Sequence, residues 1–278
     1  MAGFLLIRYD LGCPKDIYSF SALSMPLQHR SNLEVSVREG RIRAAVSWDN
    51  RMGKGGNQLQ RKILNPAIFH LIGSPKTKVI YDIACGNGHL ARRLIRSGAR
   101  EVWASDVSAS MVAIARRKYR SRHIRYFVRN ATNFKGIPSG KFDIILVNRA
   151  IGYIAKPGLL LRGIRRALKP GGIFIFTLSH PLKTVAFRGM GRKITLKTII
   201  DAAEQYLKVG APPLANLSGS FFENRIYRRP ISSYVNLCSR YGLYINGIEE
   251  PISKSTFQPG YRHTNIPMYV VIKARKAS

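Results

Sequence analysis

The sequence predicts an α/β protein built on a mainly parallel, doubly wound sheet with helices on both faces. Between residues 78 and 178, runs rich in β-branched and aromatic residues alternate with segments of helical periodicity, which is typical of a parallel sheet covered on both sides. The first run ends in a turn through Gly86 and Gly88, where the chain passes sharply into a helical segment. Hydrophobic residues make up 45% of the chain, enough for a core and too many for global disorder. Right-handed crossover connections then require the doubly wound arrangement.

The expected strands form two groups, five parallel strands and a terminal hairpin. The parallel strands are Lys78–Ile83, Glu101–Asp106, Ile124–Val128, Phe142–Val147 and Ile173–Leu178, and the hairpin is Tyr244–Ile248 with Met268–Ala274. Helices are expected around them, placed by apolar periodicity and by capping and stop residues. They are Gln58–Leu71 (broken at Pro66), Leu90–Ser97, Ser108–Lys118, Gly158–Leu168 (stopped by Lys169–Gly172), Ile194–Leu207 and Pro230–Tyr241.

The 278 residues have room for one sizeable α/β domain together with an extension and an insertion. Residues 1–45 carry no clean periodicity and are expected to be an N-terminal extension, which leaves residues 46–278 for the domain. Residues 181–228 interrupt the alternation after the fifth strand, because they are basic, aromatic and proline-bearing.

The chain carries 46 Lys and Arg against 14 Asp and Glu, a net charge of +32. A charge of this size attracts nucleic acid, acidic lipid headgroups or anionic substrates through a salt-sensitive field. Basic residues recur on the outer faces of several expected helices, within Arg92–Arg96, Arg116–Lys118 and Arg162–Arg166, and in both tails. This even spread favours a general basic bias over one dedicated polyanion site, and RNA stays open as a partner.

The cysteines Cys13, Cys85 and Cys238 are widely spaced, with no CxxC pair for zinc and no CxxxCxxC run for an iron–sulfur cluster. The sequence therefore predicts no metal site, and reduced thiols indicate a cytoplasmic location. Met1–Ile7 is too short and lacks the basic flank of a signal peptide. No apolar run approaches the ~20 residues that span a bilayer, so no membrane segment is expected.

Residues 79–88, Val-Ile-Tyr-Asp-Ile-Ala-Cys-Gly-Asn-Gly, place the carboxylate of Asp82 beside the glycine turn. Glycines at such a turn let a ligand approach the main chain closely, and a carboxylate favours a cation. Gly86-x-Gly88-x-x-Ala91 also satisfies the dinucleotide fingerprint, and Asp106 lies at about the distance of a ribose-binding acid. Asp82 separates the two interpretations, because it would repel the pyrophosphate that a dinucleotide places on the helix N-terminus.

Together with Asp106 and the Pro170-Gly171-Gly172 turn, this segment resembles motif I of the class I S-adenosylmethionine-dependent methyltransferases, whose ligand carries an ammonium and a sulfonium group. The resemblance covers about residues 46–275. It implies a Rossmann-like, seven-stranded sheet of order 3-2-1-4-5-7-6 with its last strand antiparallel. It also implies that the insertion at about 181–228 forms a lid over the substrate, and that the segment from Trp48-Asp49 onward folds over the cofactor.

The resemblance further implies which residues hold S-adenosylmethionine. Asp82 meets its α-amino group beside Gly86 and Gly88, and Ala84 stands where the family has its first glycine, a methyl that a strand end tolerates. Asp106 accepts hydrogen bonds from both ribose hydroxyls, a role compatible with favouring the following helix N-terminus. The remaining cofactor-binding candidates are Val107 and Met111 against adenine, Asn130 and Ala131 at the adenine amino group, and Asn148 through its main-chain carbonyl. Asn130 replaces an aspartate of the family, which predicts slightly weaker binding.

His180 and Tyr153 are the candidate catalytic residues. His180 follows the fifth strand in Ser179-His180-Pro181, and open α/β sheets bind ligands at the carboxyl ends of their parallel strands. It could act as a general base or anchor a loop, and both interpretations stay open. Tyr153 is expected to line the pocket, while His263, Tyr227, Phe221 and Phe222 are weaker candidates.

Three functions are compatible with these residues. A small-molecule methyltransferase is favoured by the Ser-His-Pro strand end, the later Arg229-Pro230 segment and the large insertion. An RNA methyltransferase is favoured only by the net charge, and a non-catalytic S-adenosylmethionine-binding module is disfavoured by the intact turn. The Pro-Pro-aromatic turn of exocyclic-amine DNA methyltransferases is absent after Val147-Asn148, and the oligomeric state stays open.

Overall fold

The computed structural model describes residues 43–182, 195–207, 227, 229–252 and 267–277. The chain divides at Ala44, and the unit Ala44–Ser278 contains the sheet. The lid predicted at 181–228 falls largely outside the described residues, as do His263, Phe221 and Phe222.

The sheet has seven strands in the order β3-β2-β1-β4-β5-β7-β6, which confirms the order implied by the resemblance. The strands are β1 (Val79–Ile83), β2 (Glu101–Asp106), β3 (Ile124–Val128), β4 (Phe142–Val147), β5 (Leu168–Ser179), β6 (Leu243–Glu249) and β7 (Tyr269–Lys276). The first five pair in parallel, whereas β7 runs antiparallel to both of its neighbours, β5 and β6. All five residues of β1 are buried, as expected for a central strand covered on both faces.

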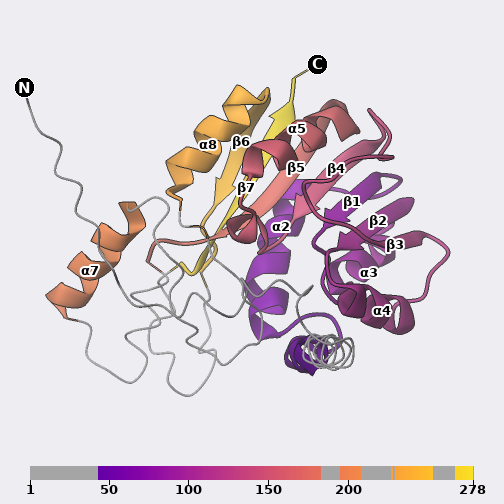
Figure 1. Cartoon of the computed structure of the whole chain (residues 1–278), viewed down its shortest axis with the longest axis horizontal. Coiled ribbons are helices and arrows are strands. Elements are labelled where there is room, and N and C mark those ends of the chain that lie inside the picture. The colour runs from indigo at the N-terminus through magenta and orange to yellow at the C-terminus, as the bar shows by residue number, and fades with distance from the viewer. Residues whose placement is uncertain (1–42, 183–194, 208–226, 228, 253–266, 278) are drawn as a thin grey trace, which may run out of the picture. The chain divides into compact units, whose positions relative to one another are not determined.

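Helices cover both faces of the sheet (Figure 1). The helical elements of the described residues are the π-helical turn η2 (Gln60–Leu64), α2 (Asn65–Ile72), α3 (His89–Arg96), α4 (Ala109–Lys118), the 3₁₀ turn η3 (Ile151–Tyr153), α5 (Pro157–Ala167), α7 (Leu196–Leu207) and α8 (Ile231–Arg240), and residues 43–52 are also helical. One core cluster joins α5 and α8 to the sheet through residues such as Leu160 and Tyr234. The other joins α2, α3 and α4 through residues such as Ile68, Leu90 and Val112. Within the described residues, no helix is long and apolar enough to cross a membrane.

The predicted break at Pro66 is wrong. The helix continues through it, because the π turn η2 leads directly into α2 and the Asn65 N–H reaches back to the Gln60 carbonyl. Proline in a helix interior lacks an N–H and clashes with the carbonyl four residues earlier. A wider π turn immediately before it relieves that clash, and Pro66 then occupies the first turn of α2.

The segment Lys169–Gly172 ends a helix as predicted, but the fifth strand starts earlier than expected. Helix α5 stops at Ala167, and β5 begins at Leu168 instead of Ile173. The register with β4 shifts between Phe142 and Ile144, so the glycines lie in an irregular start of the strand. A strand boundary inside a bulge leaves no alternation in the sequence to predict it.

Candidate functional site

Asp82, the fourth residue of β1, carries a fully buried carboxyl group at the centre of the sheet. Its side chain is 1% exposed, and in the part of the chain that the structure describes neither oxygen has a hydrogen-bond partner. Burial, and then the charge of Asp106, raise the pKa of Asp82 to about 8. A buried carboxyl without a donor is costly in its ionised form, so this group suits a ligand that brings a positive charge.

The turn after β1 is left-handed at three positions, with φ of +59° at Ala84, +55° at Gly86 and +77° at Gly88. A Cβ on Gly88 would lie 2.8 Å from the Tyr126 hydroxyl, so only glycine fits there. A Cβ on Gly86 would have Trp48 Nε1, at 3.9 Å, as its nearest neighbour. The main chain at Gly86 is therefore open to the close approach of a ligand. Ala84 adopts a left-handed conformation that strains any residue with a Cβ. The sequence analysis expected the alanine methyl to be tolerated here and did not foresee this strain.

Asp106 ties the end of β2 to this turn. Its Oδ2 accepts the Gly86 N–H at 2.9 Å, and its Oδ1 accepts the Ser108 N–H at 2.9 Å. Burial raises the pKa of Asp106, and these backbone hydrogen bonds oppose the rise. Ser108 also caps α4, because its hydroxyl accepts the Met111 N–H. The carboxylate thus has a fixed orientation beside the glycine turn.

The candidates for the adenine side lie in different environments. Val107 is 69% exposed beside the Asp106 carboxylate, whereas Met111 is buried in a small cluster with Ala45 and Ile114. Asn130 is exposed, and its Oδ1 already accepts the Thr132 N–H and hydroxyl. Ala131 packs against the larger core cluster. The cofactor roles of all four residues stay predictions.

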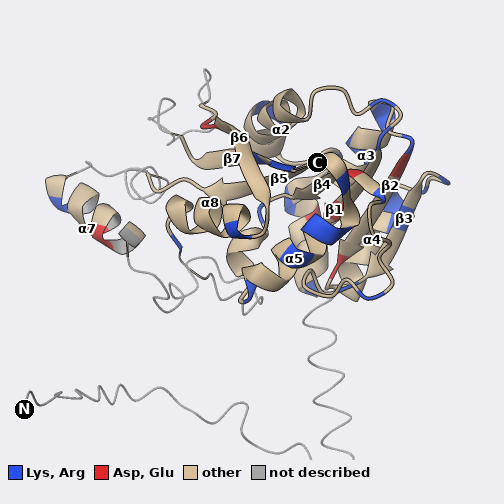
Figure 2. Ribbon diagram, turned by 90° about the horizontal axis from the view of Figure 1, so that it is seen from above, with Lys and Arg blue, Asp and Glu red and all other residues tan. Residues whose placement is uncertain are grey.

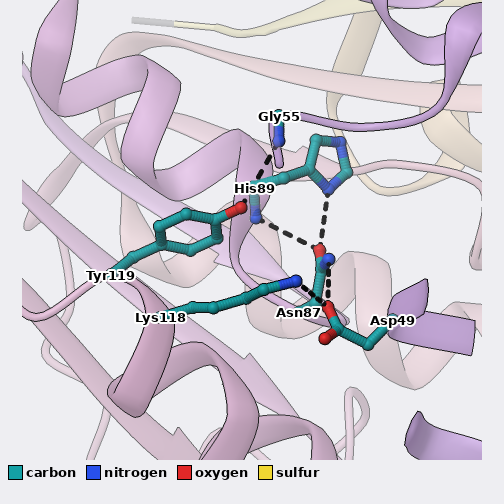
Figure 3. A network of polar contacts seen from close by, with 6 residues as sticks. All are labelled: Asp49, Gly55, Asn87, His89, Lys118 and Tyr119. Atoms are coloured by element: carbon teal, nitrogen blue, oxygen red, sulfur yellow. Dashed lines mark hydrogen bonds and ion pairs between the residues drawn. The ribbon is translucent and has the colours of Figure 1, made fainter. Parts of the chain in front are cut away.

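A polar network joins the helix at 43–52 to the glycine turn and to α4 (Figure 3). The Asp49 carboxylate accepts hydrogen bonds from Asn87 Nδ2 at 2.9 Å and from Lys118 Nζ at 2.6 Å. Trp48, the neighbour of Asp49, lies nearest to Gly86. The network therefore holds this helix across the turn where a ligand would approach the main chain.

His89, the first residue of α3, extends the network. Its Nδ1 lies 3.1 Å from Asn87 Oδ1, which also accepts the His89 N–H. Because Asn87 donates to Asp49 through its amide nitrogen, its oxygen is the acceptor and His89 carries a proton on Nδ1. Burial, and then Arg149 and Arg93, lower the pKa of His89 to about 4, so the ring is neutral at physiological pH. The sequence analysis missed Asn87 and His89, although both adjoin the glycines of the motif.

At the carboxyl end of β4, Asn148 and Arg149 are held by Thr177 of β5. The Thr177 hydroxyl donates to Asn148 Oδ1 at 3.0 Å and accepts the Arg149 N–H at 2.6 Å. Asn148 Nδ2 donates to Gln60 Oε1 of η2. Arg149 has a φ of +57°, and sequence analysis gave it no role. Arginine rarely adopts this conformation, and nothing in its local sequence signals it.

The His180 ring is held by two contacts. Its Nδ1 accepts the Leu182 N–H at 3.0 Å, so the neutral ring carries its proton on Nε2, which lies 3.1 Å from Glu250 Oε1. These are the contacts of a loop anchor, and catalysis by His180 stays a prediction. Tyr153 is 46% exposed at the end of η3. The main-chain N–H of Tyr227 donates to the carbonyl of Gly152, the residue before Tyr153.

Comparisons with known proteins bear on the family and the fold of the chain. Residues 81–176 match the methyltransferase domain family. A ubiquinone biosynthesis O-methyltransferase of Caulobacter vibrioides is 32% identical over 135 residues, which are 46% of this chain and 53% of that protein. The chain thus spans about half the length of this curated relative.

Two solved structures show the same fold. An S-adenosylmethionine-dependent methyltransferase from Mesorhizobium loti aligns with a TM-score of 0.60 at 23% identity, covering 76% of this chain and 96% of that one. The magnesium protoporphyrin IX methyltransferase of Synechocystis, with bound S-adenosylhomocysteine, aligns with a TM-score of 0.55 at 14% identity, covering 87% and 99%. With its sheet order, its glycine turn and its family match, the chain contains a class I S-adenosylmethionine-dependent methyltransferase domain.

Proposed function

We propose that this protein transfers the methyl group of S-adenosylmethionine to an O, N or C nucleophile of a small molecule. The observation that carries the proposal is the carboxyl group of Asp82, which is buried without a partner in the described part of the chain. An ammonium group beside it would satisfy both oxygens and stabilise the ionised form. A dinucleotide offers a pyrophosphate at this place instead, and its repulsion by Asp82 would weaken binding.

The residues around the turn fit the rest of the cofactor. Gly86 leaves its main chain open, and Asp106 presents a fixed carboxylate that has lone pairs left for the ribose hydroxyls. Val107, Met111, Asn130 and Ala131 would border the adenine. When bound, the cofactor supplies an electrophilic methyl group on a sulfonium.

The tasks left to the protein are alignment and the exclusion of water. Methyl transfer disperses charge in its transition state, so a dry pocket that aligns donor and acceptor supplies most of the acceleration. The Asp49–Asn87–Lys118 network holds the helix at 43–52 against the turn (Figure 3), which supports such a closed site. A general base is optional in this scheme. If His180 is one, His180→Ala will slow turnover without changing cofactor affinity.

A small-molecule acceptor is supported by the relatives and by the distribution of charge. A curated relative that is 32% identical over 135 residues is named as an O-methyltransferase of ubiquinone biosynthesis. In the described part of the chain, Lys and Arg lie on several elements, including α3, β3 and α5 (Figure 2). RNA as the acceptor is supported only by the net charge of +32, and we make it an outcome of the test.

Calorimetry with S-adenosylhomocysteine and with NADH tests the cofactor. Wild-type protein is expected to bind the former and not the latter, and Asp82→Asn is expected to weaken that binding about tenfold or more. Asp143→Asn is the matched control, because Asp143 is an aspartate at the opposite end of the sheet, where it binds Lys169 and the Val79 N–H. Binding of NADH alone would contradict the proposal.

The acceptor is tested by transfer of a labelled methyl group into a cell extract that is then separated into small-molecule, RNA and protein fractions. Label is expected in the small-molecule fraction and strongly reduced, at a cofactor concentration below the dissociation constant, when Asp82→Asn replaces the wild type. Label that appears only in RNA would replace the proposed acceptor class while leaving the cofactor assignment intact.

A further inference from the structure

Arg149 lies at the point where the strand order of the sheet reverses. From β1 the chain adds β2 and β3 on one side and β4 on the other, so β1 and β4 are neighbours at the reversal of strand order. Ligands of open α/β sheets bind in the crevice outside the carboxyl ends of the strands at such a point. Val147 pairs with Ile83, which places Arg149, two residues further on, beside the turn that begins at Ala84.

The backbone of Arg149 is strained and held in place. A left-handed conformation strains a residue with a Cβ, and such residues persist where the surroundings hold them, often at ligand sites. Here the hydroxyl of Thr177, a residue only 2% exposed, accepts the Arg149 N–H at 2.6 Å. Thr177 in turn donates to Asn148, so both residues after β4 have fixed positions.

The guanidinium of Arg149 lies between two aromatic rings. Its central carbon is 5.6 Å from the ring centroid of Trp48 and 5.5 Å from that of Tyr269. Stacked arginines keep their planar set of N–H donors free at the edge. Among the described residues, no carboxylate lies within ion-pair distance of this guanidinium and none accepts a hydrogen bond from it.

Five other acidic residues of the described part already face basic side chains. The pairs are Asp49 with Lys118, Glu101 with Arg125 and Lys141, Asp143 with Lys169, Glu249 with His70, and Glu250 with His180. Asp82 and Asp106 belong to the cofactor side of the crevice. The half-buried guanidinium of Arg149 therefore has a fixed orientation at the ligand crevice, and an anionic group on a ligand would accept its hydrogen bonds.

We propose that Arg149 is a specificity-determining residue that binds a carboxylate of the methyl acceptor. The inference rests on the proposed function and names the substrate class: an acceptor with an anionic, planar oxygen group. Its guanidinium reaches Tyr269 of β7, which pairs with Ser179 at the end of β5. That places it toward β5 and β7, whereas the expected cofactor residues other than Asn148 follow β1, β2 and β3. The acceptor, and not the cofactor's own carboxylate, is therefore its partner.

The test uses sodium benzoate and benzamide as probes, titrated into the full chain saturated with S-adenosylhomocysteine. The two probes share their shape and differ in charge. Wild type is expected to bind benzoate about tenfold more tightly than benzamide, a difference of about 1.4 kcal/mol. Arg149→Gln is expected to remove the difference while S-adenosylhomocysteine affinity stays within about twofold.

Two further variants make the result specific. Arg51→Gln is the matched control, because Arg51 also lies over the Trp48 ring, at 5.7 Å, but is exposed on the helix at 43–52; it should keep the preference for benzoate. Arg149→Gly removes the guanidinium and releases the left-handed strain, so it tests the charge even if Arg149→Gln folds poorly.

Equal binding of the two probes by wild type, or an unchanged benzoate preference in both Arg149 variants, would overturn the proposal. A tenfold loss of S-adenosylhomocysteine affinity with the preference intact would also overturn it, and would assign Arg149 to the cofactor's carboxylate. Failure of the wild type to bind S-adenosylhomocysteine would refute the proposed function instead. The benzoate and benzamide titrations, repeated without it, would then still decide the role of Arg149.

Discussion

The protonation of Asp82 should make cofactor binding depend on pH. Burial, and then Asp106, raise the pKa of this carboxyl group to about 8 in the ligand-free protein. A positively charged ammonium beside it favours the ionised form. Binding of S-adenosylhomocysteine near pH 7 should therefore expel the proton from Asp82.

The size of the effect follows from the pKa. At pH 7, a group with a pKa of about 8 is roughly nine-tenths protonated, so about 0.9 proton should be released for each ligand bound. If only the ionised form binds, affinity should rise about tenfold for each pH unit below 8 and level off above it. Asp82→Asn, which cannot ionise, should bind weakly with no proton release.

Calorimetry in two buffers with different ionisation enthalpies, at the same pH, measures the released protons directly. Affinities at pH 6, 7 and 8 give the slope, and Asp143→Asn should reproduce the wild-type result because it leaves the buried carboxyl in place. Equal affinities at pH 6 and pH 8, together with no proton release, would refute the assignment of Asp82 as the partner of the ammonium.

Further outcomes concern stability and the remaining site residues. Folding raises the pKa of Asp82 from 3.8 to about 8, so the free energy of unfolding should fall as the pH rises from 3.8 to 8. Folding lowers the pKa of His89 from 6.5 to about 4, so the free energy of unfolding should rise as the pH rises from 4 to 6.5. The two effects oppose each other below pH 6.5, so urea unfolding should show a loss of about 2 kcal/mol between pH 6.5 and 8 that Asp82→Asn removes. Ala84→Gly should raise the free energy of unfolding by up to about 1 kcal/mol, because alanine is strained at φ +59°. Ala113→Gly, on the exposed face of α4, is the control and should lower the free energy of unfolding by about 1 kcal/mol. If both variants lower it, Ala84 is not strained. Asp106→Ala should weaken S-adenosylhomocysteine binding about tenfold in calorimetry, and unchanged binding would remove Asp106 from the site.

The sequence predicts the sheet well because central strands such as β1 and β4 are buried apolar runs followed by a glycine turn or a polar residue. Asp82 lies one residue before the end of β1 and Asp106 ends β2, and the Asp106 carboxylate accepts a hydrogen bond from Gly86 in the turn after β1. The order of the strands came from the resemblance, and the structure confirms it.

What the sequence could not provide are contacts between distant residues and unusual backbone conformations. Asp49 and Lys118 are far apart in the chain, and no local pattern predicts their contact. The π turn before Pro66 contradicts the local preference of proline for ending a helix. Arg149 adopts a left-handed backbone because Thr177, on another strand, holds it there.

The position of β7 bears on how the protein is made. Among the described strands, β6 pairs only with β7, and β7 is the last of them to leave the ribosome. Until Tyr269–Lys276 has been synthesised, β5 exposes one backbone edge and β6 has no neighbour. Nascent chains that stall before Tyr269 would therefore present open edges that invite aggregation, which makes this part of synthesis the stage at which a chaperone is most useful.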